Sequence, residues 1–262
     1  MRVPTTPQDW DRVFPDSDSV PFDEDASRDS RNPLDLDQNR FLSPLIRPGM
    51  RALEAGCGRG KLVRAYARRG AFAIGLDFSV REIGGVRRSL RRERLPNAGA
   101  IAGDLLSIPL ASRSLDLYSS FGVYEHFLPS QHPRLLAEAR RVLKPGGLFY
   151  MEVPHRWSAW TFRRELRYWY RAIKPPRLVW QRNLSRRYVT RAAERQGFRT
   201  VASHVFDAWT ALAAGLSLDQ RRIKGFPNPL RFVRPHMRRF AAFCDARQWM
   251  GYTLVYIGRK PG

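Results

Sequence analysis

The chain has 262 residues, of which 43% are hydrophobic, and this suits one large domain with a substantial core. No apolar run approaches the ~20 residues that a membrane-spanning helix needs, and two cysteines, Cys57 and Cys244, give no disulfide framework. Because no basic and apolar leader follows Met1, we expect a cytoplasmic protein, with peripheral membrane association as an option.

The formal net charge is +22, and it is unevenly distributed. Residues 1–40 contain five Arg against ten Asp and Glu, whereas residues 155–199 contain thirteen Arg and Lys against two Glu. Such a basic surface favours an anionic partner, either nucleic acid or a phospholipid surface. The alternative is a GC-rich genome, whose codons favour arginine, although codon bias alone does not easily explain the uneven distribution.

Strand and helix patterns alternate along the chain. Seven strands are predicted, over residues 50–54, 71–76, 98–103, 115–119, 148–153, 199–206 and 252–259. Helices are predicted over residues 62–69, 80–94, 132–143 and 185–197, with a short helix and turn over 42–49 and mostly helical structure over 207–248. The helix from His132 should stop at Lys144–Gly147, because Pro and Gly forbid its continuation. The alternation predicts a parallel sheet with right-handed crossovers.

Residues 53–61 read LEAGCGRGK, with glycines at alternate positions after a single acid, Glu54. A glycine-rich turn between a strand and a helix lets main-chain N–H groups approach a ligand. The spacing differs from the dinucleotide pattern G-x-G-x-x-G, because Lys61 stands at the third glycine position. A P-loop is also excluded, since no G-K-[ST] follows the turn.

This motif resembles the first motif of class I S-adenosylmethionine-dependent methyltransferases. Later segments agree in order and spacing, namely GLDFS at 75–79, AGDLLSIPL at 102–110, SRSLDLYSSFGVYEHF at 112–127 and LLAEARRVLKPGGLFYMEVP at 135–154. The resemblance runs from about Met50 to Val153 and is to the broad branch that methylates small molecules, quinones and lipids. It implies a Rossmann-like α/β fold, which is a seven-stranded, mostly parallel sheet flanked by helices, here with α-helical cap insertions.

The resemblance also implies S-adenosylmethionine (SAM) as the cofactor, and no metal. The cofactor contacts would come from Glu54, Gly56, Cys57, Gly58, Gly60, Asp77, Phe78, Asp104 and Leu105. In the family, the acid at the position of Asp77 binds the ribose, the acid at Asp104 accepts from the adenine amino group, and the residue at Leu105 packs on the ring. A carboxylate suits a ribose because it can accept from two vicinal hydroxyls.

Several of these residues also have a plainer explanation. Glu54 could cap the glycine loop, Asp77 could be a helix N-cap, and Asp104 could be a turn acid. Cys57 is expected to be a small packed side chain rather than a nucleophile, and Asp116 is expected to be structural.

Two histidines, His126 and His155, follow the fourth and fifth predicted strands. Ligands of open parallel sheets bind beyond the carboxyl ends of the strands, so both are candidates for the catalytic base. Histidine titrates near ~6.5, close to working pH. His126 could instead only pack or hydrogen-bond in its loop, and some methyltransferases do little more than align their substrates.

The predicted organisation has six parts. These are an N-terminal segment (1–41) with a lid helix around Trp10–Phe14, a cofactor-binding core (42–154), a cap insertion (155–187), a continued core (188–206), a second cap insertion (207–250) and the last strand (251–262). The two insertions would build the substrate pocket. The first mixes Trp and Tyr with Arg, which suits a lipid–water interface or stacked bases beside phosphates.

The predicted function is methyl transfer to a small-molecule or lipidic acceptor. An RNA methyltransferase is the alternative, and it is weakened because SSFGVYEHF, residues 119–127, replaces the N/D-P-P-[FY/W] tetrapeptide of amino-directed nucleic-acid enzymes. A nonenzymatic SAM-binding protein is a second alternative, and the intact acids and glycines of the loop weaken it. The sequence leaves the acceptor atom and the oligomeric state open.

Overall fold

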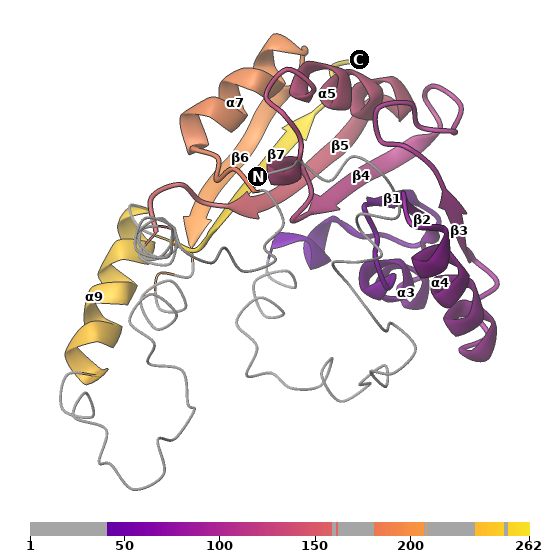
Figure 1. The fold of residues 1–262 in the computed structure, drawn as a ribbon, viewed down its shortest axis with the longest axis horizontal. Coiled ribbons are helices and arrows are strands. Elements are labelled where there is room, and N and C mark those ends of the chain that lie inside the picture. The colour runs from indigo at the N-terminus through magenta and orange to yellow at the C-terminus, as the bar shows by residue number, and fades with distance from the viewer. Residues whose placement is uncertain (1–40, 159–160, 162–180, 207, 209–233, 249–250) are drawn as a thin grey trace, which may run out of the picture.

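The computed structural model describes residues 41–158, 161, 181–206, 208, 234–248 and 251–262 (Figure 1). Its centre is a seven-stranded sheet of order β3-β2-β1-β4-β5-β7-β6. The strands are β1 (Arg51–Ala55), β2 (Phe72–Asp77), β3 (Ala98–Ala102), β4 (Leu115–Phe121), β5 (Leu143–Pro154), β6 (Arg199–Phe206) and β7 (Thr253–Arg259). Only β7 runs antiparallel to its neighbours, so the predicted mostly parallel sheet is confirmed.

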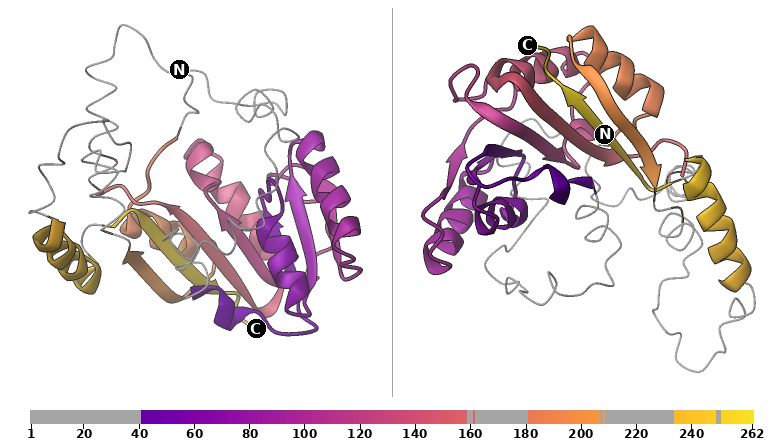
Figure 2. Two further views of the ribbon diagram at one scale, coloured as in Figure 1. Left: turned by 90° about the horizontal axis from the view of Figure 1, so that it is seen from below. Right: turned by 180° about the vertical axis from the view of Figure 1, so that it is seen from behind.

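Helices cover both faces of the sheet, as Figures 1 and 2 show. The described helices are η1 (Ser43–Leu45), α3 (Lys61–Arg68), α4 (Val80–Arg92), η2 (Tyr124–His126), α5 (His132–Val142), α7 (Arg186–Arg195) and α9 (Arg234–Arg247). The core accordingly has two halves: α5 and α7 pack with Leu53 and Ala55 on one face, and α3 and α4 pack with Ala52 on the other. Alternate residues of β1 thus face opposite layers, as strand geometry requires.

The connections that follow β1 to β6 all begin at the C-terminal edge of the parallel strands. Each strand except β7 delivers its last residue to this edge, because β6 runs in the same direction as β5. The first predicted insertion leaves from here and returns here. His155 forms an isolated bridge with Leu184, and Leu184 N donates to Pro154 O at 3.3 Å.

One predicted boundary is wrong. The segment 144–147 was expected as a break before a strand at 148, whereas β5 already begins at Leu143. Its pairing with β4 shifts register between Leu115 and Leu117, and Gly146 takes a positive φ of 78°. The chain end holds this bend in place, because Gly146 N donates to Lys260 O and Lys260 N donates to Gly147 O. These partners are remote in sequence, so local turn chemistry alone misplaces the boundary.

Three expectations lie on residues outside the described ones. They are the lid helix around Trp10–Phe14, most of the aromatic first insertion, and the first part of the second insertion. In the described part of the second insertion, α9 confirms helical structure.

Candidate cofactor site

The glycine loop between β1 and α3 is fixed by backbone hydrogen bonds to the end of β2. Both Gly56 N and Cys57 N donate to Leu76 O, at 2.7 and 3.0 Å, and Gly60 N donates to Cys57 O at 2.7 Å. The loop therefore has one defined shape before any ligand is considered, which preorganises it for binding.

Each alternate glycine has a positive φ, of 72° at Gly56, 45° at Gly58 and 67° at Gly60. A Cβ on Gly56 would lie 2.4 Å from Val123 Cγ2, and one on Gly60 would lie 2.7 Å from Val86 Cγ1. These two glycines are thus required by the protein's own packing as well as by backbone conformation. Gly58 differs, because nothing lies within 4 Å of its Cβ position. The open side of the loop is at Gly58.

Glu54 is buried at the end of β1, and its Oε2 accepts from Val63 N at 2.9 Å. The carboxylate therefore caps the first turn of α3, which is the plainer role foreseen for it. Burial raises the pKa of Glu54 to about 8, and the negative charge of Asp77 contributes to the increase. A cationic group bound near Glu54 and Asp77 would favour the ionised form of Glu54.

Asp77 joins the glycine loop to the start of α4. Its Oδ2 accepts from Gly58 N at 2.8 Å, and its Oδ1 accepts from Ser79 N at 2.9 Å. The helix N-cap is Ser79, whose side chain accepts from Glu82 N, so Asp77 is not the cap of α4. A carboxylate has about four acceptor sites, and these two backbone amides fix the orientation of the Asp77 carboxylate between the glycine loop and α4.

Phe78 and Cys57 are two further cofactor contacts predicted from the sequence. Phe78 is half-buried between Asp77 and Ser79. Cys57 is buried against Gly75, where a Cβ would lie 2.9 Å from its Sγ. Burial, followed by the charge of Glu54, raises the pKa of the Cys57 thiol. A neutral, enclosed thiol agrees with the expected packing role.

The connection after β3 carries Asp104 and Leu105. Asp104 Oδ1 accepts from Leu106 N at 2.8 Å, and Asp104 bridges to Ser107, so it does act as a turn acid. Leu105 is buried in the same core cluster as Leu53 and Leu76. That packing competes with the stacking role expected from the resemblance, which stays a prediction.

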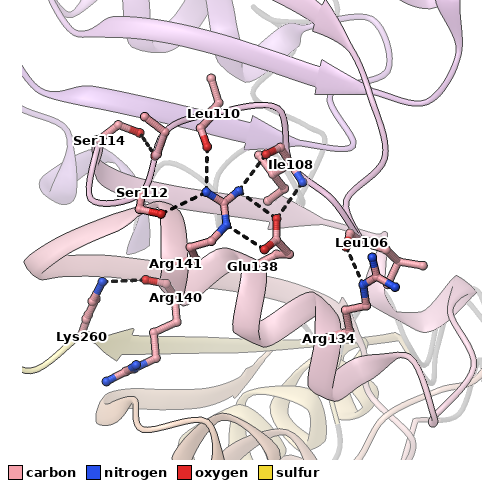
Figure 3. Close-up of polar contacts among 11 residues, drawn as sticks. Leu106, Ile108, Leu110, Ser112, Ser114, Arg134, Glu138, Arg140, Arg141 and Lys260 are labelled. Atoms are coloured by element: carbon pink, nitrogen blue, oxygen red, sulfur yellow. Dashed lines mark hydrogen bonds and ion pairs between the residues drawn. The ribbon is translucent and has the colours of Figure 1, made fainter.

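Helix α5 holds this connection in place (Figure 3), an arrangement that was not predicted from the sequence. The Arg141 guanidinium donates to Leu110 O and Ile108 O, both at 2.8 Å, and pairs with Glu138 at 2.7 Å. Glu138 Oε2 accepts from Ile108 N at 2.8 Å. The one sequence signal is the i, i+3 spacing of an acid and an arginine on a predicted helix. We call Glu138, Arg141 and the carbonyls they bind the α5 brace.

His126 lies in η2, directly after β4. Val123, three residues earlier, is the side chain that packs over Gly56, so this loop borders the glycine loop. His126 is half-buried, with Nε2 3.9 Å from Glu125 Oε1. Glu125 is itself buried, and its backbone carbonyl accepts from Arg182 N at 2.8 Å.

His155 has a different setting at the end of β5. It is buried, and its Nδ1 lies 3.2 Å from Trp157 O. Burial lowers the pKa of His155 in spite of backbone hydrogen bonds to Trp157 and Gly251, which raise it. These contacts give His155 a structural role that competes with catalysis.

Two further features bear on the site. In the part of the chain that the structure describes, no group of three His, Cys, Asp or Glu side chains could hold a metal ion. A hollow of about 580 Å³ lies beside β3, lined in part by Arg87, Arg91 and Arg94. It lies against the last turns of α4, whereas the glycine loop contacts α4 at Val86 and the chain enters α4 from Asp77. The hollow is therefore separate from the cofactor site.

The chain matches the family model described as methyltransferase domain over residues 53–151. An uncharacterized methyltransferase of Synechocystis sp. is 31% identical over 117 residues, which are 45% of this chain and 53% of that protein. A 24-methylenesterol C-methyltransferase of Oryza sativa is 30% identical over 161 residues, which are 59% of this chain and 41% of that protein. The chain thus spans about half the length of these curated relatives, or less.

Among solved structures, a geranyl diphosphate C-methyltransferase from Streptomyces coelicolor, in complex with Mg²⁺, geranyl diphosphate and S-adenosyl-L-homocysteine, is similar with a TM-score of 0.59. It is 16% identical, and the match covers 87% of this chain and 79% of that one. This likeness concerns the fold. Residues 53–151 thus match a methyltransferase domain, and the strand order and the glycine loop agree with the class I S-adenosylmethionine-dependent fold that the sequence predicts.

Proposed function

We propose that the protein transfers the methyl group of SAM to a small-molecule or lipidic acceptor. The observation that carries the proposal is the preformed glycine loop, with Glu54 and Asp77 on either side and its open face at Gly58. The resemblance of the chain to a sterol C-methyltransferase supports a lipidic acceptor. The acceptor itself is part of the proposal.

The residues present fit this cofactor. Glu54 and Asp77 form an acid pair in which the charge of Asp77 disfavours ionisation of Glu54. A ligand with an ammonium group and a sulfonium relieves that repulsion. Asp77 suits the ribose hydroxyls, because a carboxylate can accept from both of them. Phe78, Asp104 and Leu105 would border the adenine.

The bound cofactor supplies an activated methyl group, so the protein must align the acceptor and, where needed, remove its proton. We propose His126 as the base, because its loop borders the glycine loop and its ring is half-buried rather than enclosed. His155 is the second candidate, and its buried contacts with backbone carbonyls make it the weaker one.

Substitution of the histidines tests the base. In His126→Gln we expect kcat to fall by about 10²–10⁴-fold, which is the usual contribution of a general base, with unchanged binding of S-adenosylhomocysteine. His155→Gln serves as the comparison. Near-normal turnover in both variants would leave alignment as the mechanism and contradict the assignment.

We also propose that the two insertions, 155–187 and 207–250, cap the carboxyl edge and build the acceptor pocket, with the N-terminal segment 1–41 as a lid. Both insertions begin where a strand ends at this edge, after β5 and after β6. The remaining segments, 42–154, 188–206 and 251–262, make up the core in this division.

The function is tested by label transfer. The purified protein is given methyl-labelled SAM and a crude extract of its source cells, and organic-soluble, RNA, protein and small aqueous fractions are separated. We expect label in the organic-soluble or small-molecule fraction. Label in RNA would overturn the proposed acceptor class, and no label with intact cofactor binding would favour a nonenzymatic SAM-binding protein.

A further inference from the structure

Helix α9 projects from the same edge of the sheet as the glycine loop. It lies in the connection from β6, whose last residue is Phe206, to β7, which starts at Thr253. Figures 1 and 2 show α9 at the periphery, beyond β6 and away from the other helices. A surface on α9 therefore stands beside the edge where an acceptor would enter.

The inner side of α9 is anchored to the core. Ala241 and Cys244 are buried and form a small cluster with Ala208. Asp245 also turns inward, since its Oδ1 accepts from Ala208 N at 2.9 Å. The helix thus has a defined orientation on the protein, and its one acid is used on the inner side.

The outer side of α9 combines aromatic rings with cations. The exposed residues of this side are His236, Arg239, Phe240, Phe243, Ala246 and Arg247. At 3.6 residues per turn they span an arc of roughly 120°. The rings of Phe240 and Phe243 are 44% and 46% exposed, and the Arg247 guanidinium lies 4.7 Å from the centre of the Phe243 ring. No carboxylate is among these described outer residues.

We propose that this outer face of α9 docks on an anionic phospholipid surface. Single exposed apolar residues are normal, whereas here two exposed phenylalanines lie on one stripe between cationic side chains. Phenylalanines would enter the boundary between headgroups and acyl chains, while Arg239 and Arg247 would pair with lipid phosphates, as in helices that lie in a membrane interface. The charge of the chain, +22, complements an anionic leaflet. A protein partner is the competing occupant.

Contact through α9 would need no spanning segment, and none of the helices in the described residues is long and apolar enough to be one. The helix has 14 residues and is about 21 Å long, at 1.5 Å per residue, so it would lie along the surface. An acceptor held in the bilayer could then reach the carboxyl edge of the sheet without leaving the interface.

Co-sedimentation of the whole protein with vesicles tests this surface. The vesicles are phosphatidylglycerol with phosphatidylcholine, or phosphatidylcholine alone, at low and high salt and without cofactor, so the outcome does not depend on methyl transfer. We expect binding to the anionic vesicles that weakens with salt. The double variant Phe240→Ala/Phe243→Ala should bind at least tenfold more weakly.

The matched control is Phe72→Ala. Phe72 is 55% exposed, more than either α9 ring, and it begins β2 at the opposite edge of the sheet. Arg239→Gln/Arg247→Gln, compared with Arg88→Gln/Arg92→Gln on α4, tests the cations in the same way. Unchanged vesicle binding by the α9 variants, an equal loss in Phe72→Ala, or no binding of the wild type to anionic vesicles would overturn the proposal.

Discussion

Glu54 combines a role in folding with its proposed role in ligand binding. It caps α3 through Val63 N and lies buried beside Asp77, so folding encloses an acid that water would otherwise solvate. Such a buried acid is destabilising when it is ionised. This cost agrees with the proposed binding of a cationic cofactor, because functional sites often contain groups with perturbed pKa values.

The first prediction concerns the pH dependence of stability. The pKa of Glu54 is about 8 in the folded protein, against an ordinary value of 4.5. The unfolded chain therefore releases this proton at lower pH than the folded chain does, and the stabilisation present below pH 4.5 is lost as pH rises to 8. In Glu54→Gln, the free energy of unfolding should fall less steeply between pH 5 and 8, by up to about 1.4 kcal/mol per pH unit.

Urea unfolding at a series of pH values measures this difference. Glu138→Gln is the control with the opposite sign, because the hydrogen bond from Arg141 lowers the pKa of Glu138. That variant should lose stability above the ordinary pKa and little below it. Parallel pH profiles for Glu54→Gln and the wild type would contradict the buried, protonated state of Glu54.

Among the elements, α5 fixes the loop that carries Asp104. Arg134 and Arg141 both donate to carbonyls of this loop, Arg134 to Leu106 O and Arg141 to Leu110 O and Ile108 O (Figure 3). Loops at a binding site usually need such support from a rigid element. The candidate cofactor site thus depends on a helix that contributes no residue to it.

Our second prediction separates these two arginines. Arg141→Ala removes several bonds of the α5 brace, so it should cost about 1–3 kcal/mol of stability. Arg134→Ala removes one carbonyl contact on an exposed side chain and should cost less, by at least about 1 kcal/mol. Hydrogen exchange at Ile108 and Leu110 should rise in Arg141→Ala. Equal effects of the two substitutions would remove the brace as an explanation.

The two ends of the first insertion are joined by a buried polar clasp. Thr161 Oγ1 donates to His155 O at 3.0 Å, accepts from Asn183 Nδ2 at 2.7 Å and lies 2.8 Å from Ser158 Oγ. Together with the bridge from His155 to Leu184, these bonds bring the departing and returning chains together. Removing the Thr161 hydroxyl should be costly, because it would leave several buried hydrogen-bonding partners without it.

Thr161→Val tests the clasp, since valine keeps the shape and deletes the hydroxyl. We expect a loss of about 1–3 kcal/mol in urea unfolding, because buried partners of Thr161 are left unsatisfied. Thr190→Val, at a half-buried position on α7, should change stability by less than about 0.5 kcal/mol. If both variants lose the same amount, the clasp contributes nothing specific.

For the whole molecule, the sequence predicts the sheet well and the site in part. Alternating strand and helix patterns gave all seven strands, and β6 was predicted with its observed bounds. The start of β5 was wrong because Lys260, far away in sequence, shapes the bend at Gly146. The packing around the glycine loop also depends on residues that are distant in sequence. Val123 and Val86 leave no room for a side chain at Gly56 and Gly60, and no local sequence pattern predicts these contacts.

The distribution of charge is also a property of the whole chain. Residues 61–94 alone contain ten Lys and Arg against three Asp and Glu, a net charge of +7, so the basic character is not confined to the first insertion. One of these arginines has a structural role, because Arg87 Nε donates to Ala100 O of the edge strand β3 at 2.8 Å. Because the Ala100 carbonyl already accepts from Arg87 and positive side chains lie beside β3, this edge strand is protected from pairing with another chain.

The measurement that tests the central claim most directly is calorimetric titration with S-adenosylhomocysteine. Wild type, Asp77→Asn and Asp116→Asn are compared, and thermal melting confirms that each variant is folded. Asp116 is the matched control, since its carboxylate also accepts from a backbone amide, that of Arg51, but at the start of β1. We predict one site in the wild type and in Asp116→Asn, and at least tenfold weaker binding in Asp77→Asn, about 1.4 kcal/mol or more. Equal affinity in Asp77→Asn and wild type, or no binding by the wild type, would contradict the account.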